Sequence, residues 1–176
     1  MRESLAGLAW IERRVGDESQ WLVLWNERWQ QYALVGGHLE ADESLRECVL
    51  REVEEELRLT RGQDFQVSEQ ALVQLDYEAF SESVQEQTRY RHVVFSLTLT
   101  TDAQDRIESQ PGVRWVTDGE IERRATTDGL PIAEQVERAW REIQKLSLSA
   151  QPLMRRPLDE FDFFVSYAID EQSYGA

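Results

Sequence analysis

Apolar runs alternate with short polar segments in the first part of the chain. The runs at 4–15 (SLAGLAWIERRV) and 21–26 (WLVLWN) flank a turn-like GDESQ, so together they predict a β-hairpin. The segment QYALV at 31–35 predicts a short third strand that ends at the pair Gly36 and Gly37. The chain is therefore expected to open with extended structure.

The period of the apolar residues changes after this point. Apolar side chains recur every fourth residue, at Leu45, Val49, Val53 and Leu57. This spacing predicts an amphipathic helix, because residues four apart lie on one helix face. Asp42 or Ser44, in the segment ADES just before the run, can cap the first turn.

The second half of the chain returns to extended structure before a last helix. The segments 65–80 and 88–100 are rich in β-branched and aromatic residues and predict two longer strands joined by a polar loop. A further strand is predicted at 112–117, and a second helix at 131–146 with Pro131 in its first turn. Because strands and helices do not alternate strictly, this order favours an α/β fold with a mixed sheet between helices over a doubly wound parallel sheet.

Composition narrows the class of protein. With 176 residues, 41% hydrophobic content and a formal charge of −15, the chain predicts one globular domain and disfavours a broad nucleic-acid-binding surface. Lys145 is the only lysine, which excludes a P-loop, and Cys48 is the only cysteine, which excludes an internal disulfide. No secretion signal and no bilayer-spanning apolar run is present, so a cytoplasmic protein without a membrane partner is expected.

Three carboxylates converge on the predicted helix. Glu52, Glu55 and Glu56 stand at i, i+3 and i+4, and therefore project within about 100° of one another. Such like charges repel, but a hard divalent cation reverses the sign of the interaction. Mg²⁺ prefers oxygen ligands and commonly bridges carboxylates to substrate phosphates. The cluster therefore predicts a metal and, through it, a phosphate-containing substrate.

The spacing of these residues extends into a longer motif. The matched positions are Gly37, Glu43, Arg51, Glu52, Val53, Glu55, Glu56 and Leu59. They resemble the Nudix box, G-x5-E-x7-R-E-U-x-E-E-x-G-U with U aliphatic, and Arg58 stands where that box has its second glycine. Residues 5–146 resemble a Nudix hydrolase domain, which implies an α/β/α sandwich around a mixed β-sheet.

The resemblance also implies roles for individual residues. Glu52, Glu55 and Glu56 match metal-binding glutamates, and the Gly36 carbonyl matches a backbone metal ligand; Mg²⁺ is expected, with Mn²⁺ as an alternative. Arg51 would orient the glutamates, and Glu43 would brace the loop. Substrate contacts are expected at Gly37, His38 and Trp29. The proton acceptor for the attacking water is left open among Glu55, Glu82 and Glu86.

Several of these candidates have a plainer structural explanation. His38 is more commonly a loop residue without a ligand role, and Cys48 is expected to be a small buried core residue. The tryptophans that could stack a base are Trp21, Trp25, Trp29 and Trp115. Core packing is the simpler expectation for each, with Trp29 in the polar segment NERWQQY as the best stacking candidate.

The end of the chain differs in character. Residues 147–159 contain prolines and small residues without a period and predict a linker after the Nudix domain at 1–146. The tail at 160–176 contains FDFFVSYAIDE, which resembles the first strand of a TIR domain. An ordinary strand added to the sheet is the alternative. The resemblance implies that the chain is a piece of a longer protein with a C-terminal TIR domain.

Two functional readings follow from these resemblances. As an enzyme, the domain would cleave a nucleoside diphosphate linked to another moiety by water attack on phosphorus. ADP-ribose or a related NAD-derived nucleotide is favoured, because some TIR domains produce ADP-ribose from NAD. The alternative is a catalytically weak nucleotide-sensing module that regulates the TIR domain. A small nucleotide is the expected partner, nucleic acid and membrane are not, and a homodimer stays open.

Overall fold

The computed structural model describes residues 1–154, with side chains through Ser149. Residues 1–143 form one compact unit, and a second unit begins at Gln144. Within the part of the chain that is described, no helix is both long and apolar enough to cross a membrane. The TIR-like tail and the end of the predicted linker lie outside the described residues.

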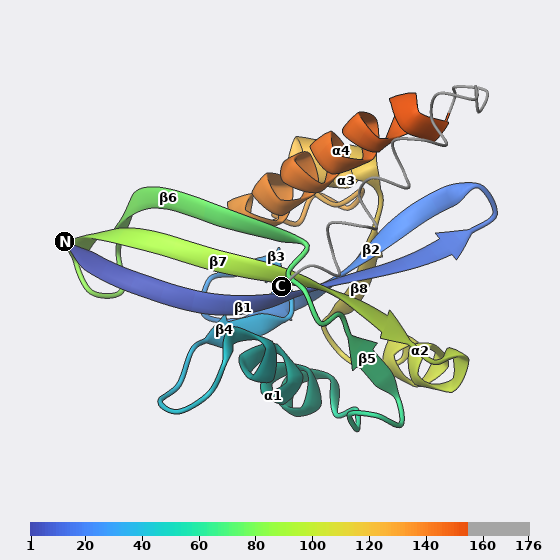
Figure 1. The fold of residues 1–176 in the computed structure, drawn as a ribbon, viewed down its shortest axis with the longest axis horizontal. Helices are drawn as coiled ribbons and strands as arrows, with labels where there is room; N and C mark the ends of the chain where they lie inside the picture. Colours follow the sequence, from blue (N-terminus) through green and yellow to red (C-terminus); the bar gives the residue numbers. More distant parts are fainter. Residues whose placement is uncertain (155–176) are drawn as a thin grey trace, which may run out of the picture. The chain divides into compact units, whose positions relative to one another are not determined.

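Eight strands and four helices make up the described chain (Figure 1). The strands are β1 (Arg2–Val15), β2 (Glu18–Asn26), β3 (Gln31–Ala33), β4 (Gly36–His38), β5 (Phe65–Val67), β6 (Val73–Ser81), β7 (Glu86–Leu99) and β8 (Val113–Val116). The helices are α1 (Leu45–Leu57), α2 (Thr101–Glu108), α3 (Asp118–Arg123) and α4 (Glu134–Met154).

The eight strands form one mixed sheet in the order β3-β2-β1-β7-β5, to which β4 adds on β1, β6 on β7 and β8 on β2. β1 and β7 run parallel, whereas the other pairs are antiparallel. β1 pairs with β7 along residues 2–11 and with β2 along 12–15, so it joins the two halves of the sheet. The predicted mixed sheet and the first hairpin are confirmed.

Both faces of the sheet are apolar, and β1 shows why. Leu8 and Trp10 belong to one buried cluster, with residues of α3 and α4, while Ala9 and Ile11 belong to a second cluster with residues of α1 and α2. Alternate side chains of a strand point to opposite faces, so a run of apolar residues serves two cores. Figure 1 shows α1 and α2 on one side of the strands and α3 and α4 on the other. This is the expected α/β/α sandwich.

Some element boundaries differ from the sequence prediction. The strand predicted at 31–35 ends at Ala33, and Gly36 and Gly37 lie in the separate strand β4. The strand predicted at 65–80 is split into β5 and β6, because the Ser68 hydroxyl donates to the Gln70 carbonyl and forms a turn there. α2 and α3 were not predicted.

The last helix also differs at both ends. α4 begins at Glu134, and Pro131 lies before it, where the Pro131 carbonyl accepts a hydrogen bond from the Tyr32 N–H at 2.9 Å. The helix continues to Met154, into the segment 147–159 that was predicted to be a linker. The domain boundary at residue 146 stays a prediction.

Candidate active site

α1 begins with a reciprocal pair of hydrogen bonds. The Ser44 hydroxyl accepts from the Glu47 N–H at 3.2 Å, and the Glu47 carboxylate accepts from the Ser44 N–H at 2.9 Å. These bonds satisfy donors that the first turn of a helix leaves unpaired. Ser44 is therefore the cap rather than Asp42, and Glu47 serves the start of the helix.

Two glycines allow α1 to lie directly on the sheet. A Cβ at Gly7 would stand 2.6 Å from the Leu45 carbonyl oxygen, and a Cβ at Gly37 would stand 2.0 Å from Glu52 Oε1. Both distances are shorter than atoms in a close-packed interior can approach. Because β1 and β4 carry no side chain at these two paired positions, the Glu52 carboxylate lies against the backbone of β4.

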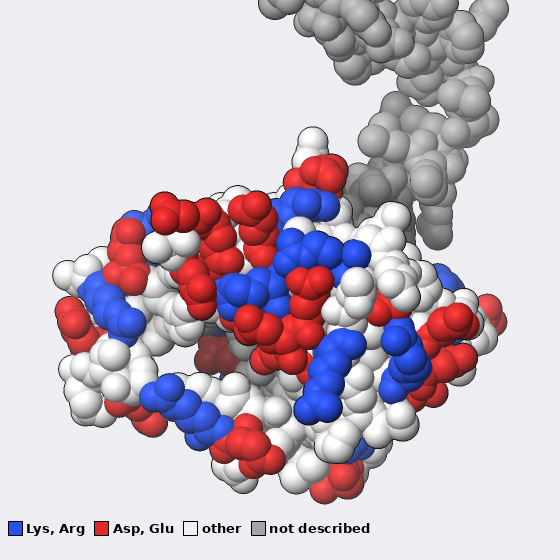
Figure 2. Space-filling view, turned by 90° about the horizontal axis from the view of Figure 1, so that it is seen from below, with Lys and Arg blue, Asp and Glu red and all other residues white. Residues whose placement is uncertain are grey.

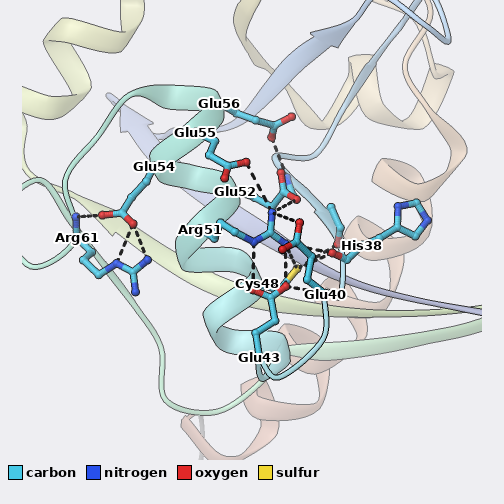
Figure 3. Close-up of polar contacts among 12 residues, drawn as sticks. His38, Glu40, Glu43, Cys48, Arg51, Glu52, Glu54, Glu55, Glu56 and Arg61 are labelled. Carbon is cyan, nitrogen blue, oxygen red and sulfur yellow. Dashed lines mark hydrogen bonds and ion pairs between the residues drawn. The ribbon is translucent and has the colours of Figure 1, made fainter.

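Arg51 connects the carboxylates around it (Figure 3). Its Nε and Nη2 donate to the two oxygens of Glu43 at 3.1 and 2.7 Å, and Nη1 donates to Glu52 Oε1 at 2.8 Å. Nη1 also lies 3.7 Å from Glu55 Oε2 and 3.8 Å from Glu40 Oε1. The guanidinium holds the pKa of Glu43 at about 2, with help from a backbone hydrogen bond from Glu40. Arg51 thus fixes where the Glu52 carboxylate points.

The loop between β4 and α1 is tied to the helix by further bonds. Glu43 Oε1 accepts from the Glu40 N–H at 2.8 Å, and Arg51 Nη2 donates to the His38 carbonyl at 3.2 Å. The Cys48 thiol donates to the Gly37 carbonyl at 3.3 Å. Cys48 is fully buried, as the sequence predicted, and burial raises the pKa of its thiol. These contacts hold β4 and the helix in one fixed arrangement.

The three glutamates of the predicted cluster have different surroundings. The Glu52 side chain is 15% exposed, whereas the Glu55 side chain is 62% exposed. Glu56 Oε2 accepts from the Gly36 N–H at 3.1 Å. Desolvation, followed by repulsion from Glu52 and Glu55, raises the pKa of Glu56 to about 7. Glu56 is also exposed at the surface, so contact with water limits the rise in its pKa.

Other acids of α1 do not belong to this group. Glu54 points away from it in Figure 3 and pairs with Arg61, whose Nη2 lies 2.5 Å from Glu54 Oε2. Figure 2, seen from the side on which α1 lies in Figure 1, shows acidic side chains interleaved with arginines beside a hollow in the surface. The helix therefore separates solvated, paired acids from the converging three.

The glutamates and the Gly36 backbone offer oxygen donors to a divalent cation. Among the described residues, no three His, Cys, Asp or Glu side chains are gathered tightly enough to hold a metal as they stand. The donors nevertheless fit a hard cation, because they are carboxylates beside open backbone. Gly36 has a φ of 146°, and a Cβ there would lie 2.2 Å from the Gly7 carbonyl oxygen, so only glycine leaves this backbone bare next to Glu56. Rotation of the exposed Glu55 side chain toward the fixed Glu52 would complete the set.

The predicted substrate contacts lie in two places. His38 ends β4, and its imidazole points away from the glutamates in Figure 3. Trp29 lies in the β2–β3 turn with 46% of its surface exposed, and the Arg28 guanidinium carbon stands 5.0 Å from its ring centroid. Trp21 is buried in the cluster that faces α3 and α4, whereas Trp115 packs against the cluster that faces α1 and α2. Trp29 is therefore the tryptophan most open to a ligand.

The geometry also separates the candidate proton acceptors. Glu86 pairs with Ser81 at the far end of the β6–β7 hairpin. Val94, eight residues further along β7, pairs with Leu8 of β1, and Leu8 pairs with Gly36. The rise along β7 places Glu86 roughly 25 Å from Val94, so neither Glu86 nor the nearby Glu82 is within hydrogen-bond reach of α1. Glu55 is the candidate that the fold brings to the site.

Two residues near the site were missed by the sequence analysis. Glu40 lies beside Arg51, and Gly7 provides the close approach of α1 to β1. Glu40 falls at an unmatched position of the motif. Gly7 sits in an apolar run, and an isolated glycine inside a strand is the one signal that could have indicated a close backbone approach.

Solved structures share this fold. NrtR from Shewanella oneidensis superimposes with a TM-score of 0.59 at 16% identity over 83% of this chain, which covers 63% of the NrtR chain. A mutT/nudix family protein from Listeria innocua gives 0.53 at 15% identity, covering 84% of this chain and 98% of that chain. The NUDIX domain of NrtR solved with ADP ribose gives 0.50 at 16% identity, with 81% and 88% covered.

Sequence comparisons point the same way. A search of curated proteins found no match. The family model described as NUDIX domain matches residues 8–140, which is most of the chain and includes β4, the loop after it and all of α1. By this match, the chain belongs to the NUDIX domain family.

Proposed function

We propose that this domain is a metal-dependent hydrolase that cleaves a nucleoside diphosphate linked to another moiety by water attack on phosphorus. The observation that carries the proposal is the position of Glu52, Glu55 and Glu56 on one face of α1, where Glu56 accepts a hydrogen bond from the bare Gly36 backbone. An acidic domain that acts on an anionic substrate needs a local cation, and this is where the chain offers oxygen donors for one.

The metal would be held by the three glutamates and the Gly36 carbonyl, with Mg²⁺ favoured and Mn²⁺ as an alternative. When bound, it would neutralise charge on the phosphoryl oxygens and make an attacking water more acidic. Arg51 orients Glu52 through the 2.8 Å hydrogen bond. The Glu55 side chain is 62% exposed and is contacted by Arg51 only at 3.7 Å, so the carboxylate oxygen that does not hold the metal would accept the proton of the water.

ADP-ribose or a related NAD-derived nucleotide is the favoured substrate. Support comes from the NUDIX domain of NrtR, which was solved in complex with ADP ribose and shares this fold. NrtR was also solved with a 27mer DNA. DNA is not a proposed partner of this chain, because the chain covers only 63% of the NrtR chain and its formal charge of −15 would repel DNA. A small nucleotide remains the proposed partner.

The test compares two conservative substitutions on α1. Glu56→Gln removes one carboxylate charge from the cluster with little change in volume, so hydrolysis of ADP-ribose with Mg²⁺ should fall by at least about 100-fold. Glu54→Gln is the matched control, because Glu54 pairs with Arg61 on the solvent side, and its turnover should stay within about twofold of the wild type. Circular dichroism checks that both variants fold. Wild-type turnover in Glu56→Gln would refute the mechanism.

The second candidate is a nucleotide-sensing module that regulates a TIR domain. The departure of the motif at Arg58 favours it, since that position is a glycine in the family box. A screen of ADP-ribose, NAD, nucleoside triphosphates and dinucleoside polyphosphates with Mg²⁺ or Mn²⁺ separates the two. Metal-dependent binding without turnover, unchanged in Arg58→Gly, would support the sensor.

A further inference from the structure

A second group of side chains lies on the sheet face opposite α1. Gly7 faces α1, so Ala6 on β1 faces the other way. The register places His38 of β4 on one side of Ala6 and His92 of β7 on the other. Two residues along the strand, Ser4 pairs with Tyr90 on the same face. His38, which belongs to this group, directly follows Gly36 and Gly37 on β4, so the group lies next to the glutamate site along the chain.

Aromatic rings form one wall of this face. The Tyr77 and Tyr90 rings stack with centroids 5.2 Å apart, and His92 meets them edge-on at 5.5 and 5.7 Å. Arg138 of α4 covers the Tyr77 ring at 4.6 Å and pairs with Glu134, which balances its charge. Burial lowers the pKa of His92 to about 4, so its imidazole is neutral and offers one donor and one acceptor.

Next to these rings is a hydroxyl with no hydrogen bond. Ser4 is 5% exposed, and its Oγ is buried without a partner. A buried polar atom left unpaired costs free energy, and native proteins rarely retain one without a use. The Tyr90 side chain, whose strand position pairs with Ser4, is only half-buried and can rotate. Its rotation would open the hydroxyl to a bound molecule.

We propose that this face is a nucleobase-binding subsite, in which a planar base stacks on Tyr90 and its edge hydrogen-bonds Ser4 Oγ and the exposed imidazole of His38, which pairs with Ala6 two residues along β1. The proposal rests on the proposed function, because it names the moiety attached to the diphosphate. The uncharged rings of Tyr77, Tyr90 and His92 favour contact with an uncharged heteroaromatic ring over a second anion. Stacking of a base on an aromatic side chain is worth roughly 1–3 kcal/mol.

The position of the subsite agrees with a nucleotide that spans it and the glutamate site. Leu8 pairs with Gly36, and Ser4 precedes Leu8 by four residues on β1. The two positions are therefore about 13 Å apart along the strand. Ribose and two phosphates separate a base from the far phosphorus in such a nucleotide, so the base would lie at Ser4 while the diphosphate lies at Gly36.

The test uses Ser4→Ala and Tyr90→Leu, with Ser81→Ala as the matched control. Ser81 is also a buried serine of this face, but its hydroxyl bonds Ser83 Oγ at 3.1 Å, at the far end of β6. Calorimetry measures the affinity for ADP and for inorganic pyrophosphate with Mg²⁺. Ser4→Ala and Tyr90→Leu should weaken ADP binding by roughly 5- to 10-fold and leave pyrophosphate unchanged. Ser81→Ala should leave both affinities unchanged.

Thermal unfolding gives an independent readout. Ser4→Ala should raise the Tm of the ligand-free protein, because it removes an unpaired buried hydroxyl, yet weaken ADP binding. A lower Tm, or an ADP affinity equal to that of the wild type, would overturn the subsite while leaving the proposed hydrolase in place. If the wild type binds neither ADP nor pyrophosphate with Mg²⁺, the proposed function fails, and the subsite fails with it.

Discussion

Arg58 occupies a backbone conformation that its side chain disfavours. It ends α1 with φ 54° and ψ 40°, the left-handed region in which glycine is usual. The flanking Leu57 and Leu59 are nevertheless both buried, so the turn keeps its packing. An arginine at this position therefore costs local backbone energy without disturbing the packing of Leu57 and Leu59.

Arg58→Gly should therefore stabilise the protein. We expect the free energy of unfolding to rise by about 0.5–1 kcal/mol, because glycine enters the left-handed region without a steric penalty. Urea denaturation measures the change, and Arg58→Ala is the control, since alanine retains a Cβ. If the glycine variant is no more stable than the alanine variant, the left-handed strain is absent.

At the scale of elements, the seating of α1 on β1 decides the geometry of the site. Gly7→Ala would place a Cβ 2.6 Å from the Leu45 carbonyl oxygen and 2.9 Å from Val49 Cγ2, so the helix must move. We expect a loss of about 1–3 kcal/mol in unfolding free energy, together with a clear loss of turnover, because the displaced helix carries Glu52 away from β4.

Gly119→Ala in α3 is the matched control for that change. A Cβ there would meet only the end of the Arg123 side chain, at 3.2 Å, and alanine is the better helix former. Its stability should equal or slightly exceed that of the wild type. Denaturation and ADP-ribose turnover should be measured on both variants, and equal behaviour of the two would show that contact at Gly7 does not position α1.

The same elements show what the sequence could and could not predict. α1 was predictable because apolar residues recur at every fourth position and the spacing of the motif agrees with a helix over the same residues. α3 was missed although Thr117 and Glu120 form a capping box, which is a readable signal in a helix of only six residues. The contact at Gly7 and the unpaired hydroxyl of Ser4 were not predictable, because both depend on residues brought together from separate strands and helices.

Across the whole molecule, the net charge of −15 means that the acidic side chains repel one another. Arginines relieve part of it locally, as Arg51 does among four glutamates and Arg61 does beside Glu54. The surface pair of Arg61 and Glu54 contributes little, and the remaining repulsion between exposed charges is screened by salt. Added NaCl should therefore stabilise the fold gradually and without preference for the glutamate site.

Mg²⁺ should stabilise the protein beyond this screening effect. Specific binding to the folded state adds about 2.7 kcal/mol when free Mg²⁺ reaches 100 times its dissociation constant. Thermal unfolding in MgCl₂ and in NaCl of equal ionic strength separates the two contributions. Glu56→Gln should lose the extra stabilisation by Mg²⁺ and keep the response to NaCl, whereas Glu54→Gln should keep both. If Mg²⁺ and NaCl act alike in the wild type at matched ionic strength, the glutamates repel without binding a cation, and their convergence on α1 would need another cause.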